Sequence, residues 1–466
     1  MAALASLLNS FLMMSIGWLV AWRYPLDRFE VFAIWWSIYT TITAFAFDYI
    51  RTGVTRYAGG KHLATERAVY VLNVATSGCI LAIAAVWALV TPSKLLAANV
   101  LVAVTTWALC EVAIAQSKAL MDNGGVVRLI FARTLILAVG LVIGMALRAG
   151  VTWLFVIVSL SNLLAVFAVP RACKRTFGAI IEACRAFRRA DLPLVGRTLF
   201  DLSPLAVAAA LLNLLMLSMR SLSVWQFDEK ATANIALSSD LGFKGVALFF
   251  AALMIFPIQR IFSAHDGDRD PKIETLAIGR LLSILSAWGL AATYFLAFVL
   301  HGFIFPQQVR ATIPPYLLIS VVSGVVLSAK LYMADLHLIA QRKVLIIVMS
   351  NVILLLSGVA AVAGFAKLIG PVGISLGGLI GITCGFLFST YKAREHIGYD
   401  QTFLLTQVGL LAVYVCGALV LGRFSGGMAG LVVQTVLIAI FLATSLGITW
   451  SQRAVKTSVL YALTGR

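Results

Sequence analysis

Long apolar blocks recur along the whole chain and constrain its fold more than any other feature. Each block holds about 20 residues, the length at which an α-helix crosses the ~30 Å hydrocarbon core of a bilayer. Only 12% of the 466 residues are charged, against about 25% in soluble proteins. The sequence therefore predicts an all-α polytopic membrane protein. We expect about 14 transmembrane helices, at residues 3–22, 30–50, 68–90, 95–117, 127–147, 151–170, 196–219, 232–258, 275–299, 312–335, 343–366, 370–391, 403–422 and 427–450.

A basic segment at residues 171–197 lies between the sixth and seventh expected spans and orients the chain. Basic loops stay on the cytoplasmic side of a membrane. The loops on the side of this segment, with the C-terminus, hold 24 of the 36 Lys and Arg, the opposite loops hold nine and the spans hold three. Both termini are therefore expected in the cytoplasm. Within the segment, apolar residues at helical spacing predict a short helix along the inner membrane surface: Phe177, Ile180, Ile181, Cys184 and Phe187.

The two halves of the chain resemble each other. DRFEVFAIWWS follows the first span and DEKATANIALSS follows the seventh, while Arg56 ends the second span and Arg260 ends the eighth. Two six-helix bundles of parallel orientation around a central cavity are a common transporter plan. The predicted domains are an N-terminal six-helix bundle (1–170), a basic cytoplasmic linker (171–195), a C-terminal six-helix bundle (196–392) and two additional transmembrane helices (393–466).

Glycines recur at four-residue steps in the twelfth span. Small residues at this spacing let a neighbouring helix approach closely, because no side chain separates the two backbones. The pattern predicts tight helix packing, with a moving gate as the alternative. The four glycines are Gly373, Gly377, Gly381 and Gly385.

Several ionisable residues lie inside the expected spans, where each costs several kcal/mol unless it is paired or hydrated. Glu111 and Arg133 are each about six residues, or ~9 Å, from the inner ends of their spans and can form a pair. Asp240 and Lys244 share one helix face near the midplane of the eighth span. Lys330 lies near the inner end of the tenth span, where it can extend toward water.

Taken together, the basic groups extend from the inner surface to the midplane in both halves. A water-filled cavity lined in this way suits an anionic group such as a phosphate. For each residue a structural ion pair is the alternative. The predicted substrate-binding residues are Arg51, Arg56, Arg133, Lys244, Arg260 and Lys330, and the residues predicted for ion coupling or charge pairing are Asp48, Glu111 and Asp240.

Other chemistry finds little support in the sequence. The six cysteines form no CxxC motif and the five histidines no HExxH motif, so we expect no metal site, cofactor or catalytic residue. The net charge of +17 fits the excess of basic residues in cytoplasmic loops. No zinc-finger spacing or aromatic RNA-binding motif indicates a nucleic-acid partner.

Three stretches resemble the polysaccharide flippase family of the multidrug/oligosaccharidyl-lipid/polysaccharide (MOP) exporter superfamily. Asp48, Gly53 and Arg56 fit the family's second span, and Pro257 with Arg260 fits its eighth. Residues 343–378 resemble its eleventh and twelfth spans. The resemblance implies a bacterial inner-membrane flippase that moves undecaprenyl-diphosphate-linked oligosaccharides for surface polysaccharide synthesis by alternating access. It also implies a polysaccharide polymerase or export proteins as partners, and it leaves the oligomeric state open.

Three other functions fit the sequence less well. A lipid II-type peptidoglycan precursor flippase has a similar fold, but the first span here holds no Arg before Arg23. A cationic-drug exporter of the same superfamily needs a carboxylate in the first span, and residues 3–20 have none. A membrane-embedded polysaccharide polymerase or acyltransferase needs a catalytic centre at a membrane face, and the outer loops are short. The sequence therefore favours a transporter over an enzyme.

Overall fold

The computed structural model describes most of the chain, and the described part is built from helices without a β-strand. Among the described residues, eleven helices are long and apolar enough to cross a membrane, or twelve if the bent pair α6 (Val151–Phe167) and α7 (Pro170–Ala186) is one span. The predicted all-α polytopic fold is thereby confirmed. The first predicted span lies mostly outside the described residues, as does the end of the eighth. The described residues are 12, 16–57, 63–90, 95–120, 122–147, 149–246, 249–250, 261, 270–295, 305, 307–341, 343–398, 400–424, 427–452 and 455–457.

The chain divides into two compact units, Met1–Ser221 and Leu222–Arg466. The division falls within α8 (Leu192–Gln226). Within unit 1, α8 contacts α2, since Arg220 donates a hydrogen bond to the backbone of Ala33. The other helices of unit 1 are α2 (Leu26–Tyr57), α3 (Leu63–Val90), α4 (Leu95–Ala119), α5 (Asn123–Ala146), α6 (Val151–Phe167), α7 (Pro170–Ala186) and the short η2 (Arg189–Asp191).

Helix α4 lies at the centre of unit 1 and packs against α2, α3, α5 and α6. Its buried face is rich in alanine, which permits close approach of the neighbouring helices. Beside it, aromatic rings of α2 pack on Phe155 of α6, with Trp36 and Tyr39 at centroid distances of 6.1 and 6.2 Å from that ring. These contacts bury polar groups of α2, α4 and α5 behind apolar rings.

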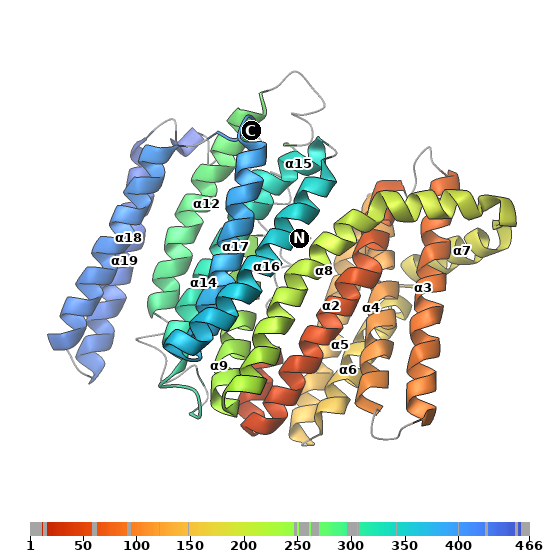
Figure 1. Ribbon diagram of the computed structural model, residues 1–466, viewed down its shortest axis with the longest axis horizontal. Coiled ribbons are helices and arrows are strands. Elements are labelled where there is room, and N and C mark those ends of the chain that lie inside the picture. The colour runs from red at the N-terminus through yellow and green to blue at the C-terminus, as the bar shows by residue number, and fades with distance from the viewer. Residues whose placement is uncertain are drawn as a thin grey trace. The chain divides into compact units, whose positions relative to one another are not determined.

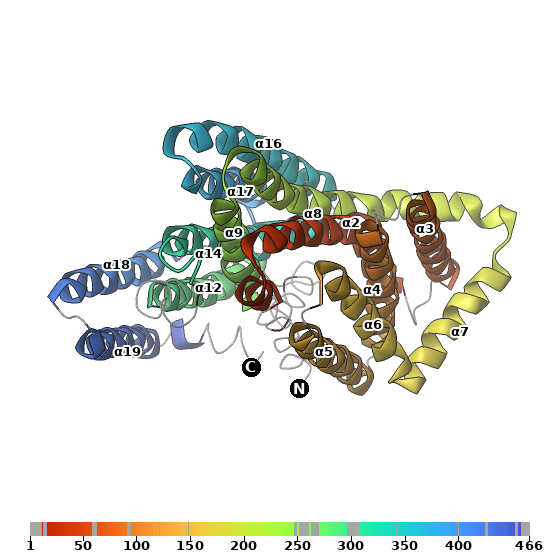
Figure 2. The same ribbon diagram turned by 90° about the horizontal axis from the view of Figure 1, so that it is seen from below.

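Helix α7 leaves the bundle sharply, at 95° to α6 (Figure 2). Pro170 opens α7, where a proline at the first helical position costs no hydrogen bond. The helix packs against α3, α4 and α6, and Ala172, Thr176 and Ala183 form its buried face. The short helix predicted from the basic segment is therefore confirmed as a helix, and it runs across the spans rather than along them.

Unit 2 is organised around α14 (Ile313–Ala329), which packs against α9, α12 and α17 and against the π-helical turns η3 and η5. Unit 2 also contains two stretches of π-helix. They are η3, which follows directly on α9, and η5, which follows directly on α14. The other elements are α9 (Glu229–Ser238), η3 (Ser239–Lys244), α12 (Pro271–Tyr294), η5 (Lys330–Asp335), α15 (Leu336–Ala340), α16 (Val344–Ile369), α17 (Val372–Ala393), α18 (Gln401–Phe424) and α19 (Gly427–Ser451).

Helices α16 and α17 form the most closely packed hairpin of unit 2 (Figure 1). A Cβ added at Gly377 would lie 2.4 Å from the Val362 nitrogen, and one at Gly381 would lie 2.6 Å from the Gly358 Cα. Gly370 makes the turn between the helices with a φ of 72°, which favours glycine. The predicted tight packing of the glycine stripe is confirmed.

Candidate functional site

A buried ion pair joins α4 to α5 inside unit 1. Arg133 Nη1 lies 2.8 Å from Glu111 Oε1, and the two side chains are only 7% and 13% exposed. Arg133 is ten residues past the start of α5 at Asn123, which is ~15 Å along the axis. This distance exceeds the ~9 Å expected from the end of the predicted span, because the helix begins earlier than that span. The pairing that the sequence allowed is present.

The surroundings of this pair are apolar and aromatic. Tyr39 of α2 is buried beside it, and the ring of Tyr39 packs on Trp36 at a centroid distance of 5.3 Å. Among the described residues the Tyr39 hydroxyl has no hydrogen-bond partner. Because water is excluded here, the attraction between the guanidinium and the carboxylate is stronger than at the surface.

A second buried pair lies within the π-helical turn η5 of unit 2. Lys330 Nζ lies 2.5 Å from Asp335 Oδ2, and the side chains are 1% and 3% exposed. In an α-helix, residues five apart project about 140° from each other and do not meet. The i→i+5 winding of a π-helix brings them to the same face. The suggestion that Lys330 extends toward water is wrong, because its ammonium is enclosed with its own carboxylate.

The remaining predicted residues are only partly described. Asp240 lies in η3 and is buried. Nine residues were predicted for substrate binding, ion coupling or charge pairing, and the structure shows two of them, Glu111 and Arg133, in contact with each other. It also shows Asp335 as the partner of Lys330. Five side chains fall outside the described residues, and for Arg260 the backbone does as well: Asp48, Arg51 and Arg56 on α2, Lys244 on η3, and Arg260.

Arg220 is a buried cation that the sequence analysis missed. Its position after the seventh expected span is typical of a loop, but it lies inside α8, six residues before the helix ends at Gln226, and is 1% exposed. Its Nη1 donates to the Ala33 carbonyl of α2 at 2.9 Å. The apolar residues that continue beyond it were the available signal, because they extend the span past Arg220.

Three polar contacts hold α7 to the bundle. Arg175 pairs with Asp122 at 2.8 Å, Thr176 donates to Gln116 at 2.9 Å, and Arg67 and Glu182 lie 3.6 Å apart. The backbone N–H of Gly125 and the Arg175 guanidinium hold the pKa of Asp122 below its ordinary value, against a smaller opposing effect of desolvation. Ile181 and Cys184 stay exposed on the opposite side of α7. This amphipathic helix is thus fixed in place at the end of the spans.

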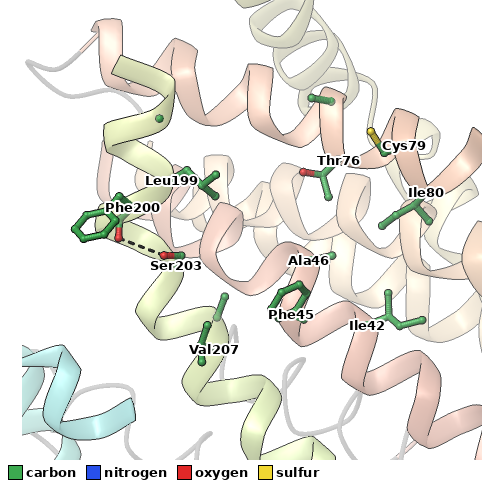
Figure 3. Close-up of a pocket in the computed structure, with 13 residues that line it drawn as sticks. Ile42, Phe45, Ala46, Thr76, Cys79, Ile80, Leu199, Phe200, Ser203 and Val207 are labelled. Carbon is green, nitrogen blue, oxygen red and sulfur yellow. Dashed lines mark hydrogen bonds between the residues drawn. The ribbon is translucent and has the colours of Figure 1, made fainter. Parts of the chain in front are cut away.

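Each unit has a cavity among its described residues. The larger, of about 820 Å³, is an apolar groove between α2, α3 and α8, open beside Phe45 and Phe200 (Figure 3). The smaller, of about 290 Å³, lies beside α12 and α18. Neither is lined by Arg133 or Lys330. Within the described residues no group of three or more His, Cys, Asp or Glu could hold a metal ion.

These features define the chain as a multi-pass membrane protein with buried ion pairs in each half. No protein-family model matches the sequence, and no curated protein matches it significantly. Solved structures match its fold, at identities too low to show more than the fold.

One such structure is the lipid II flippase MurJ in an inward closed conformation, with 11% identity and a TM-score of 0.65 over 97% of this chain and 98% of that one. A MATE transporter of Vibrio cholerae, VcmN, has 15% identity and a TM-score of 0.57 over 86% of this chain and 97% of its own. An inward-facing multidrug resistance MATE transporter of the MOP superfamily has 13% identity and a TM-score of 0.58 over 85% and 94%. The chain therefore has the fold shared by MurJ and the MATE transporters.

Proposed function

We propose that this protein is a flippase for a polyprenyl-diphosphate-linked oligosaccharide. The observation that carries the proposal is the extent of the fold likeness. The match to the lipid II flippase MurJ covers 97% of this chain and 98% of MurJ, whereas the matches to the two MATE transporters cover 86% and 85% of this chain. The two helices beyond the six-plus-six plan, α18 and α19, are then part of a lipid flippase architecture.

The buried ion pairs give the proposal its chemistry. A diphosphate carries several negative charges and accepts strong hydrogen bonds from Arg and Lys. Arg133 and Lys330 each hold one carboxylate at a buried position. We infer that the diphosphate takes the place of Glu111 and Asp335 in turn, so that each cation is neutralised before and after the substrate passes. Arg51, Arg56, Lys244 and Arg260 would guide the same group, and Asp48 and Asp240 would pair with the cations or couple an ion.

The membrane and topology belong to the same proposal. The chain would reside in the bacterial inner membrane with both termini in the cytoplasm, which fits the excess of Lys and Arg on that side. It would work by alternating access, as a transporter rather than an enzyme, with a polysaccharide polymerase or export proteins acting on the product. The hydrated, positively lined passage and the two-bundle domain plan with its linker stay predictions.

Lipid II is the second candidate substrate. The specific observation in its favour is the likeness to MurJ, whose TM-score of 0.65 exceeds the 0.57 and 0.58 of the two MATE structures. Lipid II is also a polyprenyl-diphosphate-linked glycan. The two substrates share the charged group that the cations would bind, and they differ in the sugars and peptide attached to it.

A deletion strain separates the two substrates. If the protein flips an oligosaccharide for surface polysaccharide, the strain should lose that polysaccharide and accumulate the lipid-linked oligosaccharide on the cytoplasmic leaflet, while growth of the cell wall continues. If it flips lipid II, depletion should instead accumulate lipid II and cause lysis. Normal surface polysaccharide together with normal lipid II turnover would refute both assignments. Restoration by the wild-type gene on a plasmid is the control.

A further inference from the structure

Helix α7 lies across one end of unit 1, and the bundle covers only part of its surface. It contacts the beginning of α3, the end of α4 and the beginning of α5. Arg67 is four residues past the start of α3, Gln116 is three residues before the end of α4, and Asp122 caps α5. The 95° turn from α6 directs α7 along this end of the spans (Figure 2). Helix α7 therefore lies at the depth where a membrane-spanning bundle meets the lipid headgroups.

Three cations lie together on the uncovered side of α7 and form its basic face. Arg171, Lys174 and Arg185 are all exposed. Lys174 and Arg185 are three and fourteen residues beyond Arg171, which is close to one and four turns of an α-helix, so the three share one side. In the part of the chain that the structure describes, none of them has an ion-pair partner. The acidic residue of the helix, Glu182, lies near Arg67 of α3 instead.

An apolar flank of α7 runs beside the basic face. It consists of Phe177, Ile181 and Cys184, which are four and three residues apart and so line up along the helix. Ile181 is 47% exposed. Phe177 stacks on Phe167, which ends α6, at a centroid distance of 6.0 Å, and Phe167 is itself 52% exposed. Because an exposed ring on an apolar membrane helix contacts lipid, this stacking directs the flank of α7 toward the hydrocarbon region.

The basic face and the apolar flank together match the surface of an anionic bilayer. A helix of this kind lies in the membrane interface, with its apolar side toward the acyl chains and its Lys and Arg toward the headgroups. Lipids with a net negative charge attract such cations, whereas zwitterionic lipids offer no net charge. A soluble acidic protein would match the charge of the basic face but not the apolar flank beside it.

We propose that α7 is a binding site for anionic phospholipids such as phosphatidylglycerol. The lipid phosphates contact Arg171, Lys174 and Arg185, and the acyl chains lie against Phe177 and Ile181. These lipids belong to the surrounding membrane and are not the transported substrate. The inference is independent of the proposed function, because it rests only on α7 and on the helix ends of unit 1 that hold it.

The test is photo-cross-linking of the full-length protein in nanodiscs of phosphatidylcholine. One sample contains a photoactivatable phosphatidylglycerol, and the other contains a photoactivatable phosphatidylcholine with the same acyl chains. Mass spectrometry then measures the cross-linked fraction of peptides from α7. Each Lys or Arg near an anionic surface strengthens the attraction roughly fivefold, so phosphatidylglycerol should label wild-type α7 about ten times more than phosphatidylcholine does. This excess should shrink in high salt.

Lys174→Gln/Arg185→Gln removes two charges of the basic face without changing the side of α7 that packs on the bundle. It should lower labelling by phosphatidylglycerol roughly tenfold, close to the level of phosphatidylcholine. Lys343→Gln/Arg394→Gln is the matched control, because it removes two charges from exposed residues of unit 2. The control variant should keep the wild-type excess at α7.

Equal labelling of wild-type α7 by the two lipids would overturn the proposal, as would an excess that Lys174→Gln/Arg185→Gln leaves unchanged. Labelling by neither lipid would also overturn it, since the basic face would then meet water or another protein. If the double variant proves unstable, the salt series on wild-type protein decides the question, because an excess that high salt leaves unchanged would not come from charge.

Discussion

Two buried ion pairs among the described residues, one in each unit, form in different ways. In unit 1, Arg133 and Glu111 come from separate helices, so their contact depends on how α4 and α5 pack. In unit 2, Lys330 and Asp335 belong to one turn, so their contact depends on π-helical winding. The second pair is also more enclosed, at 1% and 3% exposure against 7% and 13%.

This difference determines how each pair can open. Separation of α4 from α5 would release Arg133 without any change in helix winding. Lys330 is released from Asp335 when η5 rewinds as an α-helix, because that winding turns the two residues about 140° apart. Rewinding also rotates everything that follows in the helix. A ligand that takes Lys330 from Asp335 is therefore expected to change the register of η5, whereas a ligand that takes Arg133 is not.

The largest loss of stability is expected when the ion pair of η5 is broken. Asp335→Ala leaves the Lys330 ammonium buried without its carboxylate. Breaking a buried pair in this way typically costs about 3–5 kcal/mol. Thermal or denaturant unfolding of the purified variant in detergent measures the loss. The double variant Lys330→Met/Asp335→Leu removes both charges and should be close to wild type in stability. Equal destabilisation of the single and double variants would show that the loss does not come from leaving the Lys330 ammonium without its carboxylate.

A smaller loss of stability is expected when the ion pair of unit 1 is broken. Glu111→Ala removes the partner of Arg133, but both side chains are more exposed than those of the η5 pair. Loss of a hydrogen bond to a charged group costs about 1.5–3 kcal/mol. Glu111→Gln keeps an acceptor oxygen and should lose less, as measured by the same unfolding assay. A loss from Glu111→Ala that equals or exceeds that of Asp335→Ala would contradict the comparison.

Much of this architecture could be predicted from the sequence, because it follows from patterns that act locally. Apolar blocks of membrane length predict the spans, four-residue glycine steps predict the α16–α17 contact, and helical spacing in the basic segment predicts α7. The sequence allows Glu111 and Arg133 to pair, because they lie at equal depth on helices joined by a short loop.

The rest depends on tertiary contacts that no local pattern encodes. The π winding of η5 was not predictable, because Lys330 and Asp335 are five residues apart and an α-helix would separate them. η5 packs against α17, α14 and α12, and these contacts between distant segments leave no mark in the local sequence pattern. Arg220 was missed because an arginine after an apolar block is typical of a loop, and only the contact with α2 shows it to be buried. Pro170 marks the end of α6, but not the 95° turn that follows it.

The smallest loss of stability is expected at the surface ion pair of Arg175 and Asp122. This pair extends the comparison, because it is neither deeply buried nor held in a π-helical turn. The pKa of Asp122 is lowered from 3.8 in the folded protein, so its contribution to stability is present above that value and is lost as the pH falls through the folded pKa. Asp122→Asn should therefore lower the melting temperature slightly at pH 7, and the difference from wild type should vanish in acid and shrink in high salt. Asp201→Asn, another exposed carboxylate, is the control. A difference that persists unchanged into acid would show that Asp122 acts through the shape of its cap on α5 rather than through its charge.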